Sequence, residues 1–261
     1  MPRRILISND DGHESAGLWA LARACRSLDC DVTVVVPNKN QSAVGGSLTL
    51  RQELNWVRIE DPPVPGIDAW HVNGSPASAV IVGLNGVLDE EPDLLVSGIN
   101  RGANIGNDLT ASGTVGAALQ GHYRGITSLA ISYAMDPRAE GIDWDAAERV
   151  AAIFCREEIE GRLPKSIFLN VNVPLVPFEE IKGILVTRVA RRGYFHLEVQ
   201  GESKGFLTRG PFEPTPLDPP PGTDIWAIMH KYVSVSPLQA NFTDHHVIDA
   251  LGERFNAAWN E

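Results

Sequence analysis

Ile5-Leu6-Ile7-Ser8-Asn9-Asp10-Asp11-Gly12 is the stretch that decides the fold class of this chain. Its apolar half predicts a short buried strand, because a parallel strand that is covered on both faces reads as a continuous apolar run. Its polar half predicts a turn at the carboxyl end of that strand, which is where open α/β sheets bind their ligands. Adjacent carboxylates at such an edge repel each other unless a cation or a proton lies between them. Taken alone, the Asn-Asp-Asp-Gly run is equally consistent with an Asx-rich turn that caps the next helix.

Strand-like and helix-like segments alternate beyond this stretch. Apolar and β-branched runs predict strands at 3–8, 31–36, 93–97, 127–133 and 166–173. Apolar residues at helical spacing, with Pro76 in a first turn, predict helices at 15–28, 76–88, 114–124 and 144–158. Alternation of this kind indicates βαβ units, so we expect an α/β fold with a mostly parallel sheet flanked by helices.

The alternating pattern of strand-like and helix-like segments ends after Pro174. Residues 183–210 are punctuated by glycines and predict longer antiparallel strands. The proline-rich stretch 211–223 cannot form a helix or a central strand. A strand at 231–236 and an amphipathic helix at about 244–259 are predicted after it, and the apolar face of that helix must pack on the same chain or on a partner. We therefore expect a main domain of residues 1–180 and a C-terminal region of residues 181–261.

The composition limits the possible partners. The net charge of -11, from 22 basic and 33 acidic residues, argues against a broad nucleic-acid surface, and we expect no nucleic-acid duplex as partner. No apolar run approaches the length of a membrane span, about 18 residues, and Ile5 to Ile7 is too short for the core of a signal peptide. The three cysteines lack metal-ligand spacing and are expected to be buried thiols. We expect a cytoplasmic protein that does not bind a membrane.

Four polar clusters follow predicted strands, and a parallel sheet brings such strand ends to one edge. They are residues 9–12, 37–42, 97–106 and 111–115. Their carboxylates, hydroxyls and amide carbonyls form an oxygen-donor set that suits Mg²⁺ or Mn²⁺. Ser112-Gly113-Thr114 at a helix start offers hydroxyls and free backbone N–H groups to a phosphate. A metal beside an anion pocket indicates phosphoryl transfer or phosphate-ester hydrolysis.

Each of these features also has a purely structural interpretation. Ser112 or Thr114 alone is typical of a helix N-cap, the glycines of the third cluster alone are typical of turns, and Asn38 and Asn40 alone are typical of a polar loop. Other enzyme signatures are missing, since no G-x-G-x-x-G follows a strand and neither a Walker A nor a G-x-S-x-G pattern occurs. A cofactor-using Rossmann enzyme is therefore the weaker alternative.

The order of these clusters resembles the survival protein SurE family of metal-dependent 5′/3′-nucleotidases, over most of the chain. The blocks that carry the resemblance are Ile7-Ser8-Asn9-Asp10-Asp11-Gly12, Val36-Pro37 with Asn40-Gln41-Ser42, Val96-Ser97-Gly98-Ile99-Asn100 with Gly102, Asn104 and Gly106, Ser112-Gly113-Thr114-Val115-Gly116-Ala117-Ala118, Asn170-Val171-Asn172-Val173-Pro174, Gly222-Thr223-Asp224 and Tyr232-Val233-Ser234-Val235-Ser236-Pro237-Leu238.

The resemblance implies specific site residues. One divalent cation per subunit, Mg²⁺ or Mn²⁺, is expected on Asp10, Asp11, Ser42 and Asn100. Catalysis is expected to rest on Asp10, Asp11 and Asn9, and the phosphate pocket is expected to comprise Asn9, Ser42, Asn104, Ser112, Gly113 and Thr114. The implied reaction is hydrolysis of nucleoside 5′(3′)-monophosphates to nucleoside and phosphate.

The resemblance also implies a Rossmann-like catalytic domain over residues 1–180 and a C-terminal β-hairpin arm, returning strand and terminal helix that build a homodimer or homotetramer. Three positions depart from the family pattern: Ala111 replaces a usual Tyr, Ser78 a usual Asp and Gln120 a usual Glu. None of them is an implied metal ligand. These departures leave open a nucleotide- or phosphate-binding protein of the same fold with weak activity.

Overall fold

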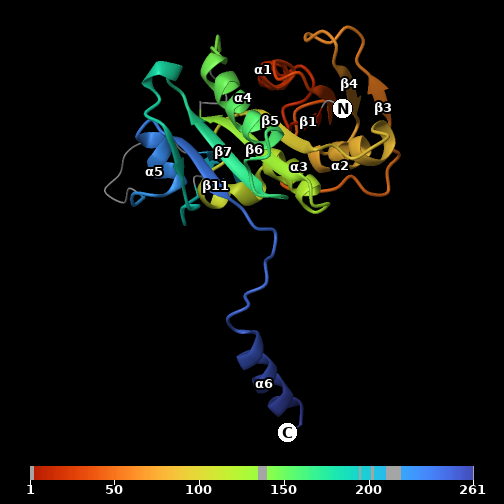
Figure 1. The fold of residues 1–261 in the computed structure, drawn as a ribbon. Helices are drawn as coiled ribbons and strands as arrows, with labels where there is room; N and C mark the ends of the chain where they lie inside the picture. The colour runs from red at the N-terminus through yellow and green to blue at the C-terminus, as the bar shows by residue number, and fades with distance from the viewer. Residues whose placement is uncertain (1–2, 135–139, 194, 201–202, 210–218, 261) are drawn as a thin grey trace.

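The computed structural model describes residues 3–134, 140–193, 195–200, 203–209 and 219–260. Its main feature is a nine-stranded sheet in the order β3-β4-β2-β1-β5-β6-β7-β11-β8 (Figure 1). These strands are β1 (Arg4–Ser8), β2 (Asp31–Pro37), β3 (Trp56–Arg58), β4 (Asp68–Val72), β5 (Leu94–Arg101), β6 (Thr127–Ala134), β7 (Phe168–Pro174), β8 (Ile184–Val186) and β11 (Val233–Pro237). Pairing is parallel from β4 through β7, so the expected mostly parallel α/β fold is confirmed.

Helices cover both faces of this sheet. Helices α1 (Ala16–Arg26) and α4 (Asp145–Ile159) contact each other and share one buried apolar cluster, whereas α2 (Pro76–Val82) and α3 (Gly113–His122) share a second one. Strand β1 lies between the two clusters, with Ile5 and Ile7 in the first and Leu6 in the second. Burial on both faces is the reason for its continuous apolar run.

Shorter helical elements lie between these strands and helices. A π-helical turn, η1 (Gly83–Val87), continues α2, and 3₁₀ helices η2 (Gly106–Ala111) and η3 (Phe178–Glu180) lie in connections. No described helix has both the length and the apolar character that a membrane crossing needs.

The sequence did not predict β3, β4 or helix α5 (Asp224–Met229). Strand β3 has only three exposed residues, and β4 interrupts its apolar residues with Asp68 and His71, so neither shows a clear period. The expectation of antiparallel strands throughout 183–210 is wrong for β8, which pairs in parallel with β11. Helix α5 lies between them in the chain and lets β11 return in the same direction as β8, as a crossover connection does.

The C-terminal region contains the expected hairpin, with β9 (Phe195–Gln200) antiparallel to β10 (Lys204–Arg209). Most of the proline-rich stretch, residues 211–218, lies outside the described residues. Strand β11 pairs antiparallel with β7, so this region adds strands to the main sheet. The terminal helix α6 (Ile248–Trp259) lies apart from the body at the end of an extended segment, and none of its residues is buried (Figure 1).

Candidate active site

The first candidate carboxylate, Asp10, is buried between the end of β1 and the first turn of α3. It accepts a hydrogen bond of 2.7 Å from the Thr114 hydroxyl, and the Thr114 backbone N–H also favours its charged form. Burial, together with the neighbouring Asp11 carboxylate, outweighs these contacts and raises the pKa of Asp10 to about 7. A cation placed beside Asp10 would therefore relieve an unfavourable charge.

Gly113 allows this close approach of β1 to α3. A Cβ atom at this position would lie 2.7 Å from Asp10 Cβ and 2.9 Å from Asp10 Oδ2. Any larger residue would displace the carboxylate. The need for a small residue here explains why a glycine occupies the first position of a helix, where it is otherwise unfavourable.

The second carboxylate, Asp11, is held by two neighbouring loops. Its Oδ2 accepts a hydrogen bond of 3.1 Å from the Arg101 backbone N–H, and its Oδ1 accepts one of 3.1 Å from Asn40 Nδ2. Burial outweighs these contacts and raises the pKa of Asp11. The loop after β2 is fixed to the same place because Gln41 N–H donates to the Asp10 carbonyl over 2.7 Å. The expected convergence of strand ends is thus observed for the first three clusters.

Asn100 and Ser42 differ in how they are held. Asn100 is buried at the end of β5, and its Nδ2 donates to the Gly102 carbonyl over 2.8 Å, while its Oδ1 accepts no hydrogen bond from any described residue. Ser42 is exposed, and its backbone N–H donates to Asn40 Oδ1 over 3.0 Å. Asn100 therefore offers a free carbonyl oxygen and Ser42 a free hydroxyl on the loop that holds Asp11.

Asn9 is fully buried and closes the turn after β1. Its Nδ2 donates to the Gly12 carbonyl over 2.9 Å, and its Oδ1 accepts from the Gly12 backbone N–H over 3.2 Å. Gly12 has a φ of +92°, which favours glycine. Asn9 thus orients the two carboxylates in this structure, and its predicted contact with phosphate stays a prediction.

A network of buried polar side chains contacts Thr114, the residue whose hydroxyl bonds to Asp10. Asn104 Nδ2 donates to Ser132 Oγ over 2.8 Å and approaches Thr114 Oγ1 at 3.4 Å. The Asn104 backbone is in turn held by β7, since its N–H donates to Asn172 Oδ1 over 2.8 Å and its carbonyl accepts from Asn170 Nδ2 over 2.8 Å. The chain of contacts fixes the Thr114 hydroxyl toward Asp10.

The start of α3 combines a cap with a possible anion site. Ser112 Oγ accepts from the Val115 N–H over 3.1 Å, which is the N-cap role noted as an alternative for this residue. The Gly113 N–H donates to no described residue. Because Asp10 already lies against this turn, an incoming phosphate would share the helix terminus with the carboxylate.

Several supporting residues were not predicted as functional. Asn40, which alone is typical of a polar loop, donates a hydrogen bond to Asp11. Asn170 and Asn172 were noted only within a motif, yet both are fully buried on β7 and hold Asn104. Asp224 is also fully buried and accepts from the Gly106, Ala190 and Ile225 backbone N–H groups over 2.8–2.9 Å. The sequence signal that could have found Asn170 and Asn172 is their alternation with apolar residues along β7.

The residues present fit a hard divalent cation. Among the residues that the structure describes, no group of three or more His, Cys, Asp or Glu side chains could hold a metal ion. Two carboxylates, one amide carbonyl and one hydroxyl remain, all of them oxygen donors. Mg²⁺ in particular is bound by one or two carboxylates and keeps several waters. Burial of Asp10 and partial burial of Asp11 raise both pKa values, so a positive charge between them would favour the ionised pair.

The departures at Ser78 and Ala111 are accommodated locally. Ser78 Oγ accepts from the Thr49 backbone N–H over 2.8 Å and lies 2.9 Å from Ser75 Oγ, so the serine anchors the 48–50 segment itself. The Ala111 carbonyl accepts from the Gly45 N–H over 2.9 Å, a backbone contact that does not depend on the side chain. Neither departure touches the carboxylates.

Comparison with known proteins agrees with this geometry. Residues 5–196 match the family model described as Survival protein SurE. The chain is 41% identical over 239 residues to 5′-nucleotidase SurE of Dehalococcoides mccartyi strain ATCC BAA-2266, covering 90% of this chain and 88% of that protein. It is 40% identical over 253 residues to 5′-nucleotidase SurE 1 of Thermus thermophilus, covering 95% of this chain and 96% of that protein.

A solved structure shows the same fold. The crystal structure of SurE protein from Aquifex aeolicus superposes with a TM-score of 0.80 at 36% identity, covering 95% of this chain and 97% of that one. The resemblance noted in the sequence is therefore confirmed. This chain belongs to the survival protein SurE family.

Proposed function

We propose that this protein is a 5′-nucleotidase that hydrolyses nucleoside 5′(3′)-monophosphates with the help of one divalent cation, Mg²⁺ or Mn²⁺. The observation that carries the proposal is the adjacent pair at the edge of the sheet, the buried Asp10 and the half-buried Asp11, both with raised pKa values. Relatives of this chain that are named 5′-nucleotidase SurE support the same reaction.

The metal would be held by Asp10, Asp11, Asn100 and Ser42. When bound, it supplies a Lewis acid that polarises the phosphoryl oxygens and acidifies a water. Thr114 keeps Asp10 in place through its hydroxyl. The phosphate would meet the first turn of α3, where the Gly113 N–H donates to no described residue.

The proposed chemistry is displacement at phosphorus. The oxygen of a water forms a bond to phosphorus, one carboxylate of the Asp10–Asp11 pair accepts the proton that the water loses, and the phosphorus–oxygen ester bond breaks. The leaving oxygen takes this proton from the carboxyl group and departs as the nucleoside hydroxyl, which restores the carboxylate. Asn9, Asn104, Ser112 and Thr114 are the proposed groups that stabilise charge on the phosphoryl oxygens, directly or through the loops they hold.

A substrate panel with a metal series tests the proposal. Phosphate release from AMP, GMP, CMP, UMP and p-nitrophenyl phosphate is measured in EDTA, Mg²⁺ and Mn²⁺. We expect turnover that EDTA abolishes and a divalent cation restores. Absence of metal-dependent turnover of every substrate at high protein concentration would contradict the assignment.

A binding protein with weak activity is the second candidate, and the departures at Ala111, Ser78 and Gln120 favour it. Such a protein would take up AMP in calorimetry while releasing little phosphate from any substrate. Restoring the family residues separates the two candidates: Ala111→Tyr combined with Gln120→Glu should raise turnover strongly in a weakened enzyme and change little in a competent one.

We further propose that α6 builds a homodimer or homotetramer. Its apolar residues Ile248, Leu251, Phe255 and Trp259 are 46–89% exposed, so a partner is needed to cover them. Light scattering should show an oligomer for the full chain and a smaller species after removal of residues 239–261. We also propose a cytoplasmic location, which the three buried, unpaired cysteines support.

A further inference from the structure

Helix α5 begins with a buried carboxylate that the candidate active site does not include. Asp224 is fully buried. Its Oδ2 accepts a hydrogen bond of 2.8 Å from the Gly106 N–H, and its Oδ1 accepts bonds of 2.9 Å and 2.8 Å from the Ala190 and Ile225 N–H groups. One side chain therefore joins the loop after β5, the segment 190–193 that precedes β9, and α5.

The chemistry of this position calls for a carboxylate. Burial raises the pKa of Asp224, and its bonds from three backbone N–H groups lower the pKa without cancelling that effect. Ionised carboxylate accepts at both oxygens, whereas asparagine has one oxygen and one nitrogen that only donates. The need to accept on both sides of the side chain explains why a charged group lies here in spite of its burial.

The loop after β5 packs directly on the segment 190–193. The Asn107 N–H donates to the Arg192 carbonyl over 2.8 Å. A Cβ atom on Gly106, whose φ is +57°, would lie 2.1 Å from the same carbonyl oxygen. A small buried cluster, separate from the two main ones, comprises Ala103, Ile105, Ala190 and Ile225. The loop is therefore held at a fixed position against the C-terminal region.

The residues on both sides of Gly106 belong to the candidate active site. Asn104, two residues before it, approaches the Thr114 hydroxyl at 3.4 Å. Helix η2 begins at Gly106 and leads in six residues to the turn 112–114, whose Thr114 bonds to Asp10. A displacement of Gly106 is therefore expected to move the groups that would meet the phosphoryl oxygens.

The proposed metal ligands are held by other contacts. Asp11 bonds to the Arg101 N–H and to Asn40, and Asn100 bonds to the Gly102 carbonyl. None of these bonds involves Gly106 or the segment 190–193. A change at Asp224 should therefore act on the phosphate side of the site and leave the cation side intact.

We infer that Asp224 is a positioning residue for the phosphate side of the site, which holds Gly106 so that Asn104 and the turn 112–114 face the phosphoryl group. It touches neither the substrate nor the cation. The inference rests on the proposed function and adds to it a residue of the C-terminal region.

Asp224→Asn tests the inference because it breaks one of the three links. Its Oδ1 can still accept from Ala190 and Ile225, while its Nδ2 faces the Gly106 N–H, and two donors cannot bond. We expect kcat for AMP and for p-nitrophenyl phosphate to fall by the same factor, about tenfold, since small displacements at a site have large effects. The Kd of Mn²⁺ in calorimetry should not change.

Thr187→Val is the matched control, since it removes another buried hydrogen-bonding group of the C-terminal region. The Thr187 hydroxyl bonds to Ser234 and Ser236. This variant should keep the kcat and the Mn²⁺ affinity of the unmodified chain when each protein is assayed below its melting temperature. If Asp224→Asn does not fold, Gly106→Ala displaces the same loop and should give the same loss of kcat at constant Mn²⁺ affinity.

Three results would overturn the positioning role. They are an unchanged kcat in Asp224→Asn, an equal loss of kcat in Asp224→Asn and Thr187→Val, and a loss of Mn²⁺ affinity in Asp224→Asn as large as its loss of kcat. Each of them would mean that Asp224 contributes to the fold alone.

Binding of inorganic phosphate separates this inference from the proposed function. If the unmodified chain hydrolyses no substrate, which contradicts the nucleotidase proposal, phosphate affinity in calorimetry replaces kcat as the readout. Phosphate should then bind about tenfold more weakly to Asp224→Asn than to the unmodified chain and Thr187→Val, as for the loss of one hydrogen bond to a charged group. Equal or absent phosphate binding in all three proteins would overturn the positioning role.

Discussion

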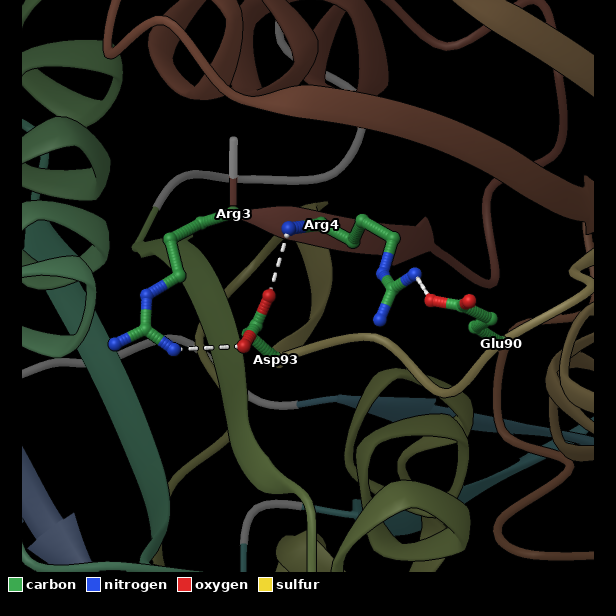
Figure 2. A network of polar contacts seen from close by, with 4 residues as sticks. All are labelled: Arg3, Arg4, Glu90 and Asp93. Carbon is green, nitrogen blue, oxygen red and sulfur yellow. Dashed lines mark hydrogen bonds and ion pairs between the residues drawn. The ribbon is translucent and has the colours of Figure 1, made fainter. Parts of the chain in front are cut away.

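The carboxylates at the two ends of the β1–β5 strand pair have opposite electrostatic surroundings. At the amino end, the Asp93 carboxylate accepts from Arg3 Nη1 over 2.7 Å and from the Arg4 backbone N–H over 2.9 Å, and Arg4 also pairs with Glu90 (Figure 2). At the carboxyl end of the same strands, Asp10 has a hydroxyl and a backbone N–H as partners and a second carboxylate beside it.

The pKa values follow these surroundings. Burial alone would raise the pKa of Asp93, but the Arg4 N–H and the Arg3 guanidinium outweigh it and hold the value below the ordinary one. The pKa of Asp10 is raised instead. The amino end is therefore complete without a ligand, whereas the carboxyl end would gain stability from an added cation. In the polar run after β1, Asn9 and Gly12 close the turn, and the two carboxylates are the groups that a ligand would use.

Substitution of Asp10 should have the largest effect on the difference between the two ends. In Asp10→Asn, phosphate release from AMP should fall by about 100-fold or more, because a charged metal ligand is lost. Mn²⁺ should no longer raise the melting temperature as it does for the unmodified chain. Without metal, the variant should be at least as stable as the unmodified chain at pH 8, since the buried charge of Asp10 is removed. Circular dichroism melts and a phosphate assay measure these effects.

Asp93→Asn serves as the matched control, since it removes the same kind of charge at the other end of the same strands. Its turnover and its Mn²⁺-dependent rise in melting temperature should match those of the unmodified chain. Full turnover in Asp10→Asn would refute the assigned site.

Enlarging Gly113 should disturb the carboxyl end without removing any charge. In Gly113→Ala, the new Cβ would lie under 3.0 Å from Asp10, so the carboxylate must move. We expect kcat/KM for AMP to fall by about tenfold or more, since small displacements at a site have large effects. Gly252→Ala in α6 meets nothing within 4 Å and should keep full activity. Equal activity of the two variants would show that the Asp10 position tolerates displacement.

Removing the Thr114 hydroxyl should have a smaller effect. Thr114→Val deletes the donor 2.7 Å from Asp10 Oδ1, and we expect about a tenfold loss of kcat/KM and a loss of stability of about 1–2 kcal/mol. Thr114→Ser keeps the hydroxyl and should retain most of the activity. Urea unfolding and AMP kinetics test the pair, and equal kinetics for valine and serine would mean that the hydroxyl does not orient the carboxylate.

The comparison also shows what the sequence could predict. The buried strand 5–7 and the polar clusters after parallel strands have local signals, so the fold class and the convergence at Asp10 and Asp11 were predicted. The partners of those residues depend on contacts distant in sequence. Asn172 supports Asn104 from β7, and the two meet only because the sheet places β5, β6 and β7 side by side. Short β3 and β4 lacked a period, so neither strand was foreseen.

The amino end of the strand pair should give the smallest effect. Asp93→Asn should lower the free energy of unfolding by about 1 kcal/mol at pH 7, because it weakens the bond that the carboxylate accepts from the Arg4 N–H. The loss is small because the carboxylate is 32% exposed and this bond is partly screened by solvent. Since the folded pKa is lowered, this contribution is present above the ordinary pKa of an aspartate, about 3.9, and is lost as pH falls through the folded value. The urea midpoints of the variant and the unmodified chain should therefore differ at pH 7, and the difference should shrink as the pH is lowered below about 3.9.

Asp68→Asn is the control for this last prediction. Asp68 pairs with Arg58 at 55% exposure, so its loss should change stability by less than about 0.5 kcal/mol. If both variants behave alike, the charges of the amino end are no better fixed than an ordinary surface pair, and the contrast with the carboxyl end rests on Asp10 alone.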